Sequence, residues 1–167
     1  MSGPKVGAEF VTHEFDEAIA VQQAIVDAQA ALSDAHPVAT AKRAIKASLA
    51  DDRRFLADLK RFGKQHDATG KVEDVAGGLK ELMETTLDGA RKDGADSDFY
   101  EAHAVLLNLK RKQMDSAAAV VKIARAAKDT DLRDAAIAFE RGQRESSRTL
   151  ARELADYAVD IAQASRS

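Results

Sequence analysis

The sequence contains no cysteine, and this absence removes several kinds of chemistry at once. Without a thiol the chain can form no disulfide, no thiolate metal site and no cysteine nucleophile. Tryptophan is also absent, only two prolines occur, and aromatic residues make up only 5% of the chain. Alanine, leucine and charged residues dominate instead, which is typical of helical bundles rather than of sheet proteins.

Long apolar runs and an excess of one charge are missing as well. No run approaches the roughly 18 apolar residues of a membrane span, and residues 1–7 lack the apolar core of a signal peptide. The formal net charge of −3 is too balanced for nucleic acid to be the expected main partner. We therefore expect a soluble, cytoplasmic protein that does not associate with a membrane. The lack of cysteine agrees with a reducing compartment.

Apolar residues recur at alternating spacings of four and three residues, which is the pattern of helices that bury one face. The pattern predicts four long helices, at 10–33, 38–64, 97–128 and 129–164, and a shorter one at 72–91. Pro37 lies in a short connection, so the first two helices should be antiparallel neighbours. The sequence thus predicts an all-α protein, an antiparallel four-helix bundle with a short extra helix in the crossover between helices two and three. The predicted bundle forms a single domain at 10–164, with tails at 1–9 and 165–167.

Glycine and serine positions indicate where these helices weaken or end. Gly77 and Gly78 each cost a helix about 1 kcal/mol relative to alanine, so a break in the short helix is expected there. Gly94 is placed to end that helix, and Ser97 is placed to cap the next one. Gly142, in the middle of the last helix, indicates that the backbone of a neighbouring helix comes close.

Each long helix carries a polar residue near the middle of its apolar seam: Gln22, Asp52, Gln113 and Gln143. The middles of all helices meet at one level of an antiparallel bundle, so these side chains could converge there. Burying an unpaired amide costs about 1–3 kcal/mol, so the layer should be satisfied internally or by water. Two alternatives to this buried layer stay open. The glutamine amides could be hydrated at the edge of the bundle, and Asp52 could pair with an Arg or Lys of a neighbouring helix.

Dinuclear carboxylate proteins hold two metal ions at this level of a four-helix bundle, with Glu and Glu-x-x-His ligands. The chain resembles the YciE/YciF domain family of the ferritin-like superfamily in its length and in the order of its helices. Residues 72–83 (VEDVAGGLKELM) resemble the family's Gly-Leu-x-Glu crossover segment, and residues 110–118 (KRKQMDSAA) resemble its Glu-His-Tyr-Glu region. The resemblance implies a ferritin-like fold, a homodimer and a bacterial, stress-associated role.

The metal-ligand positions that this resemblance implies hold other residues here. They are Gln22 in the first helix, Asp52 with Phe55 in the second, Gln113 in the third, and Glu140 with Gln143 in the last. Neutral amides bind hard dications far more weakly than carboxylates do. We therefore expect a lost or weak di-metal centre, no catalytic residue and no cofactor. Asp52 and Glu140 are the residual candidates for weakly held iron or manganese.

The four histidines offer no metal-binding spacing such as His-x-x-x-His. We expect each of them at the surface or at a helix boundary: His13, His36, His66 and His103.

Three functions are compatible with the sequence. The first is a non-enzymatic ferritin-like bundle protein with a degenerate metal centre. The second is a residual di-iron or di-manganese oxidase or ferroxidase that uses Asp52 and Glu140. The third is a helical interaction module that binds an anionic partner through the basic face of the second helix.

Charge is distributed unevenly between the second helix and the crossover. The second helix carries Lys42, Arg43, Lys46, Arg53, Arg54, Lys60, Arg61 and Lys64 against Asp51, Asp52 and Asp58. The crossover carries Glu73, Asp74, Glu81, Glu84 and Asp88. This contrast indicates complementarity within the chain or between subunits, or a solvated face. No aromatic residues alternate with the basic ones, which makes nucleic acid an unlikely partner.

Overall fold

A computed structural model describes residues 5–72 and 75–164 of the chain, and within these residues all regular structure is helical. The elements are α1 (Ala8–Ala35), α2 (Ala39–Gly63), a 3-10 turn (Lys64–His66), α3 (Val75–Asp93), α4 (Asp96–Ala127) and α5 (Thr130–Ala164). The prediction of an all-α chain is confirmed. Residues 1–4 and 165–167 of the predicted tails lie outside the described residues, as do Glu73 and Asp74 of the acidic crossover.

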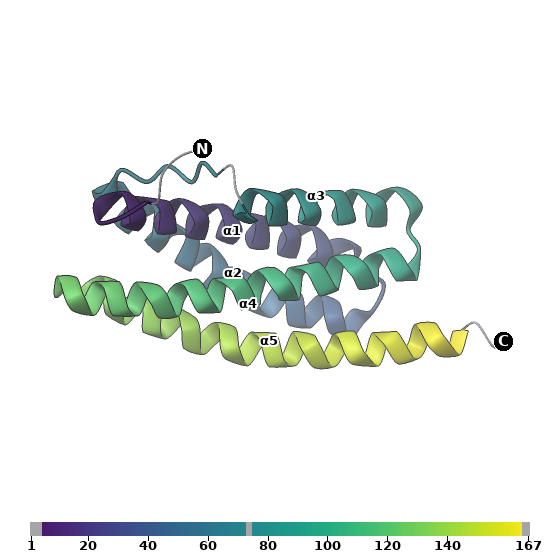
Figure 1. Cartoon of the computed structure of the whole chain (residues 1–167). Helices are drawn as coiled ribbons and strands as arrows, with labels where there is room; N and C mark the ends of the chain where they lie inside the picture. The colour runs from purple at the N-terminus through teal and green to yellow at the C-terminus, as the bar shows by residue number, and fades with distance from the viewer. Residues whose placement is uncertain (1–4, 73–74, 165–167) are drawn as a thin grey trace.

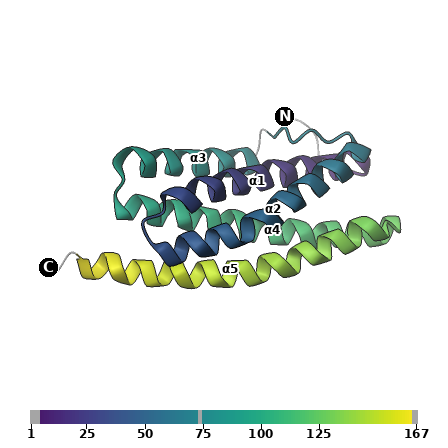
Figure 2. The same ribbon diagram turned by 180° about the vertical axis from the view of Figure 1, so that it is seen from behind.

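The four long helices lie side by side, and each runs antiparallel to its neighbours (Figures 1 and 2). α1 and α5 each pack against both α2 and α4. The loop after α2 runs back along part of the bundle and α3 continues in the same direction to its far end, so α2 and α4 run in the same direction. α3 packs across α1 and α4, on the side opposite the contact between α2 and α5. No helix in the described part of the chain combines the length and the apolar character needed to cross a membrane.

Helix ends differ from the predicted ones by a few residues, and the predicted break in α3 is wrong. α3 is continuous from Val75 to Asp93, so packing on α1 and α4 outweighs the cost of its glycines. α4 begins at Asp96 with Ala95 at its cap position, not with Ser97. Gly94 ends α3 as predicted, because it adopts a φ of +64° and its N–H donates to the carbonyl of Ala90.

The apolar core consists of two clusters, one toward each end of the four long helices. One contains Ile25, Leu32, Ile45, Leu106, Leu109 and Leu150, with Met83 and Leu87 of α3. The other contains Phe15, Ile19, Leu59, Phe62, Val120 and Phe139. Buried polar side chains of α1, α2, α4 and α5 lie at the level between these clusters. The polar layer thus divides the core.

Gly70 gives the first test of the fold, because it needs both a left-handed backbone and the absence of a side chain. Its φ is +77°, and an added Cβ would lie 2.7 Å from Cγ2 of Ile19. We expect Gly70→Ala to lower the free energy of unfolding by about 1–3 kcal/mol, measured by urea denaturation.

Gly142 is the matched control for this substitution. The prediction that a helix backbone approaches Gly142 is wrong, because a Cβ placed there meets no atom within 4 Å. Gly142→Ala should therefore stabilise the exposed middle of α5 by about 0.5–1 kcal/mol. Equal effects of the two substitutions would contradict this account.

Candidate functional site

The centre of the candidate site is the ammonium group of Lys110, a residue of α4 whose side chain is fully buried. Its Nζ donates to Oδ2 of Asp52 at 2.8 Å and to Oε1 of Gln143 at 2.9 Å. The hydroxyls of Ser48 and Ser146 lie 3.5 Å from the same nitrogen. Side chains from α2, α4 and α5 thus surround one buried positive charge.

The other carboxylate oxygen of Asp52 is hydrogen-bonded as well. Oδ1 accepts hydrogen bonds from Nε2 of Gln22 at 3.0 Å and from Nε2 of Gln143. Gln143 therefore bridges the ion pair, since its amide donates to the carboxylate and accepts from the ammonium of Lys110. The three groups form a closed ring of hydrogen bonds, and Gln22 ties this ring to α1.

Burial and pairing act in opposite directions on Lys110. Burial lowers the pKa of its amine below the ordinary value, because desolvation penalises the charged form, while Asp52 raises it. An ammonium has three protons, and here two of them meet an acceptor at less than 3 Å. The hydroxyls of Ser48 and Ser146, at 3.5 Å, are the nearest acceptors for the third proton. A buried ion pair needs hydrogen bonds of this kind to offset its desolvation.

The structure brings together Gln22, Asp52 and Gln143 of the predicted layer, but not Gln113. Nε2 of Gln113 donates to the backbone carbonyl of Ala18 at 2.8 Å, so this side chain faces α1 rather than the ring. The three glutamines are buried, so the interpretation that their amides are wet is wrong. Glu140 also lies away from the layer, where it pairs with Arg144 at 2.7 Å.

Sequence reasoning missed Lys110 although a signal was present. Lys110 follows Leu106 by four residues and precedes Gln113 by three, so it shares their face of the helix. The alternative of a salt bridge from Asp52 to a lysine of another helix is present, but the lysine comes from α4, which lies diagonally across the bundle from α2 and not beside it. Ser48 was also missed, and its hydroxyl accepts from Nε2 of Gln29 at 2.6 Å.

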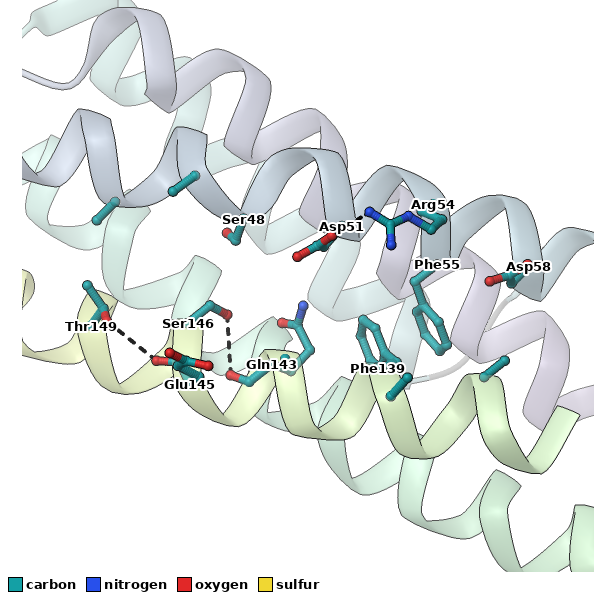
Figure 3. A pocket seen from close by; sticks show the side chains of 15 residues that line it. Ser48, Asp51, Arg54, Phe55, Asp58, Phe139, Gln143, Glu145, Ser146 and Thr149 are labelled. Atoms are coloured by element: carbon teal, nitrogen blue, oxygen red, sulfur yellow. Dashed lines mark hydrogen bonds and ion pairs between the residues drawn. The ribbon is translucent and has the colours of Figure 1, made fainter. Parts of the chain in front are cut away.

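A cavity of about 470 Å³ lies between α2 and α5 (Figure 3). Ser48, Gln143 and Ser146 line it, and these are three of the residues that hold the ammonium of Lys110. Phe55 and Phe139 also line it, with their rings stacked at a centroid distance of 3.3 Å and an angle of 8°. This cavity, which we call the α2/α5 groove, therefore reaches three of the side chains that surround the buried ion pair.

A second buried polar cluster lies away from this groove, and it corrects the prediction for two histidines. His36 and His103 are not surface residues, because they are 1% and 0% exposed. Nε2 of His36 lies 3.4 Å from Nδ1 of His103. Tyr157 packs beside His36, and its hydroxyl donates to Asp96 at 2.8 Å. The cluster fastens the turn between α1 and α2 to α4 and α5.

The hydrogen bonds of this cluster require two neutral rings. The N–H of Val38 donates to Nδ1 of His36, which places the proton of that ring on Nε2. Nε2 of His103 lies 3.0 Å from the carbonyl of Leu150 and donates to it, so Nδ1 is free to accept from His36. Burial, and then the proximity of His103, lower the pKa of His36 to about 4; burial also lowers the pKa of His103.

The sequence matches no family model, and no curated protein or solved structure matches it.

The donor atoms at mid-bundle do not fit a di-metal centre. They comprise one carboxylate, which an ammonium already binds at 2.8 Å, and neutral amides and hydroxyls. Among residues 5–72 and 75–164 no group of three or more His, Asp or Glu side chains could hold a metal ion.

Proposed function

We propose that this chain is a non-enzymatic, ferritin-like four-helix-bundle protein in which the ammonium of Lys110 takes the place of bound metal. One observation carries the proposal: Nζ of Lys110 lies 2.8 Å from Asp52 and 2.9 Å from Gln143, at the level between the two core clusters. Ferritin-like di-metal proteins build their metal site from inward-facing side chains at this level. Here a cation that belongs to the chain satisfies the carboxylate.

The charge balance supports this proposal. Two divalent ions need several carboxylates to neutralise them, whereas a single ammonium needs one. Asp52 supplies that one negative charge, and amides stand at the positions where further carboxylates would be required. The order of helices, with one long crossover between α2 and α4 that contains α3, supports the ferritin-like assignment. The stress-associated role, the cytoplasmic location and the homodimer are proposals that follow from the family resemblance.

Metal analysis tests the proposal directly. Purified protein incubated with Fe²⁺ or Mn²⁺ and then dialysed should retain far less than two ions per chain, because Lys110 repels a cation from the only carboxylate of the layer. Elemental analysis by mass spectrometry provides the measurement, and Lys110→Gln is the comparison that removes the repulsion. Two tightly held ions in the unaltered protein would refute the proposal.

The alternative of a residual oxidase or ferroxidase requires Asp52 and Glu140 to share a metal ion. Asp52 is bound by Lys110, and Glu140 pairs with Arg144 on the partly exposed side of α5. The two carboxylates therefore serve different partners, which favours the non-enzymatic function. The same incubation with Fe²⁺ distinguishes the two, because an oxidase would consume oxygen and would lose that activity on Asp52→Ala.

A further inference from the structure

The floor of the α2/α5 groove has a polar end and an aromatic end. Ser48 and Gln143 lie at the polar end, Phe55 and Phe139 lie at the other, and all four are buried. Figure 3 shows the two pairs at different levels between α2 and α5. Ser48 precedes Phe55 by seven residues on α2, which places the two levels about 10.5 Å apart along the helix. One small molecule with two chemically different ends can therefore contact both.

The walls of the groove are built from small residues. Ala47 on α2 and Ala138 and Gly142 on α5 line it and are exposed. Side chains of this size leave open a volume of about 470 Å³, which lies within the range of about 300–1,000 Å³ that is typical of small-molecule sites. The groove therefore has the size of a ligand site, and its walls reach the solvent.

The polar end of the floor adjoins a buried proton donor that the fold satisfies poorly. The ammonium of Lys110 donates two of its three protons to Asp52 and Gln143, at 2.8 and 2.9 Å. Among the described residues the third proton meets only the hydroxyls of Ser48 and Ser146, both at 3.5 Å, and both of these residues line the groove. Hydrogen bonds of this length are weak. The buried cation thus lacks a good acceptor on the side that faces the groove.

The two hydroxyls can extend this hydrogen bonding to a ligand. Ser48 donates its own proton to the carbonyl of Ile45 at 3.4 Å. Ser146 donates to the carbonyl of Gln143 at 3.3 Å. Both bonds are long and lie within one helix, so each hydroxyl can turn to donate to a ligand oxygen while it accepts from the ammonium of Lys110. The polar end therefore favours a ligand that carries an acceptor oxygen.

The charges at the rim favour a cation over an anion. Three carboxylates and one guanidinium line the groove, namely those of Asp51, Asp58, Glu145 and Arg54. Asp51 pairs with Arg54, and Asp58 pairs with Arg61, but such partly exposed pairs within one helix are weak. The excess of negative charge repels an anion, so we expect the ligand to carry a positive charge and its acceptor oxygen to be neutral.

We propose that the α2/α5 groove binds a small organic amine that carries an apolar ring and a neutral oxygen, as an aromatic amino alcohol does. The ring lies over Phe55 at the aromatic end, and the oxygen accepts from the hydroxyls of Ser48 and Ser146. The ammonium stays at the rim, beside the carboxylates of Asp51 and Glu145 and away from the buried lysine. This proposal goes beyond the metal-free function and does not depend on it, because the groove exists whether or not the bundle ever held metal.

An NMR titration of the whole chain with phenylalaninol tests the proposal, since this compound combines the ring, the ammonium and a hydroxyl. The amide signals of Ala47, Ala138 and Gly142, which line the groove, should shift and saturate. Phenyllactate keeps the ring and a hydroxyl but carries a negative charge. It should bind more weakly by a factor on the order of ten or more, because the carboxylates at the rim repel it.

Three variants assign the contacts. Asp51→Asn/Glu145→Gln removes two exposed carboxylates of the groove and should weaken the binding of phenylalaninol about tenfold. The matched control is Glu101→Gln/Asp115→Asn, which removes two exposed carboxylates of α4 and should bind normally. Ser146→Ala should weaken phenylalaninol about fivefold but leave phenethylamine, which lacks the hydroxyl, unaffected. A loss of folding would weaken both compounds alike, so this difference separates a lost contact from a lost fold.

Three results would overturn the proposal. The first is a titration with phenylalaninol that gives no saturable shift at the groove. The second is phenyllactate that binds as tightly as phenylalaninol. The third concerns Ala138→Trp, which places a large ring into the groove from its exposed wall. This variant should abolish binding, and unchanged binding would show that the ligand occupies another site.

Discussion

We expect Lys110→Met to lower the free energy of unfolding by about 3–5 kcal/mol, which is the largest effect of any single substitution considered. Methionine fills the volume of lysine but leaves the fully buried Asp52 without its cation. Gln22 and Gln143 still donate to the carboxylate, but two neutral donors do not replace an ammonium 2.8 Å away. Urea denaturation provides the measurement, and a loss of this size is a large part of the 5–15 kcal/mol that stabilises a typical domain.

Two further variants separate the ion pair from its burial. Asp52→Leu/Lys110→Met removes both charges together and should restore most of the stability, because no unpaired charge remains in the core. Lys112→Met breaks the pair with Glu17, where Lys112 is partly exposed, and should cost no more than about 1 kcal/mol. A Lys110→Met variant within about 1 kcal/mol of the unaltered chain would show that the buried ring contributes little.

Acid should destabilise the protein through His36 and His103, and the sign follows from their pKa values. The pKa of His36 falls from 6.5 in the unfolded chain to about 4 in the fold. Above pH 6.5 both states hold a neutral ring; below it the unfolded chain binds a proton that the fold excludes. Stability therefore falls as the pH decreases from 6.5 to about 4, by about 3 kcal/mol for His36 alone. His103, whose pKa is also lowered, adds to the loss.

Urea denaturation between pH 7 and 5 measures this slope before most carboxylates titrate. His36→Leu/His103→Leu should remove most of the pH dependence in that range, whereas His66→Gln should retain it, since His66 lies outside the buried cluster. The neighbouring charges of Asp96 and Lys42 act on His36 in opposite directions and remain in every variant. A double variant with the slope of the unaltered chain would contradict the assignment.

The helices were predictable because their signal is local. Apolar residues at spacings of three and four, and a glycine such as Gly94, are enough to place helices to within a few residues. The contacts inside the bundle were not predictable in the same way. Asp52 meets a lysine 58 residues further along the chain, and His36 meets a histidine 67 residues away. A buried lysine or histidine looks like a surface residue until its distant partner is known.

The closed ring of Asp52, Lys110 and Gln143 also determines how the helices are aligned along their axes. Apolar seams of alanine and leucine fit one another almost equally well after a shift of one turn, about 5.4 Å. Such a shift of α4 would carry the ammonium past its acceptors on α2 and α5 and leave two charges unpaired in the core. The polar layer therefore selects one axial register from several that the apolar residues alone would allow. A chain that packs in another register is destabilised, because it buries unpaired charges.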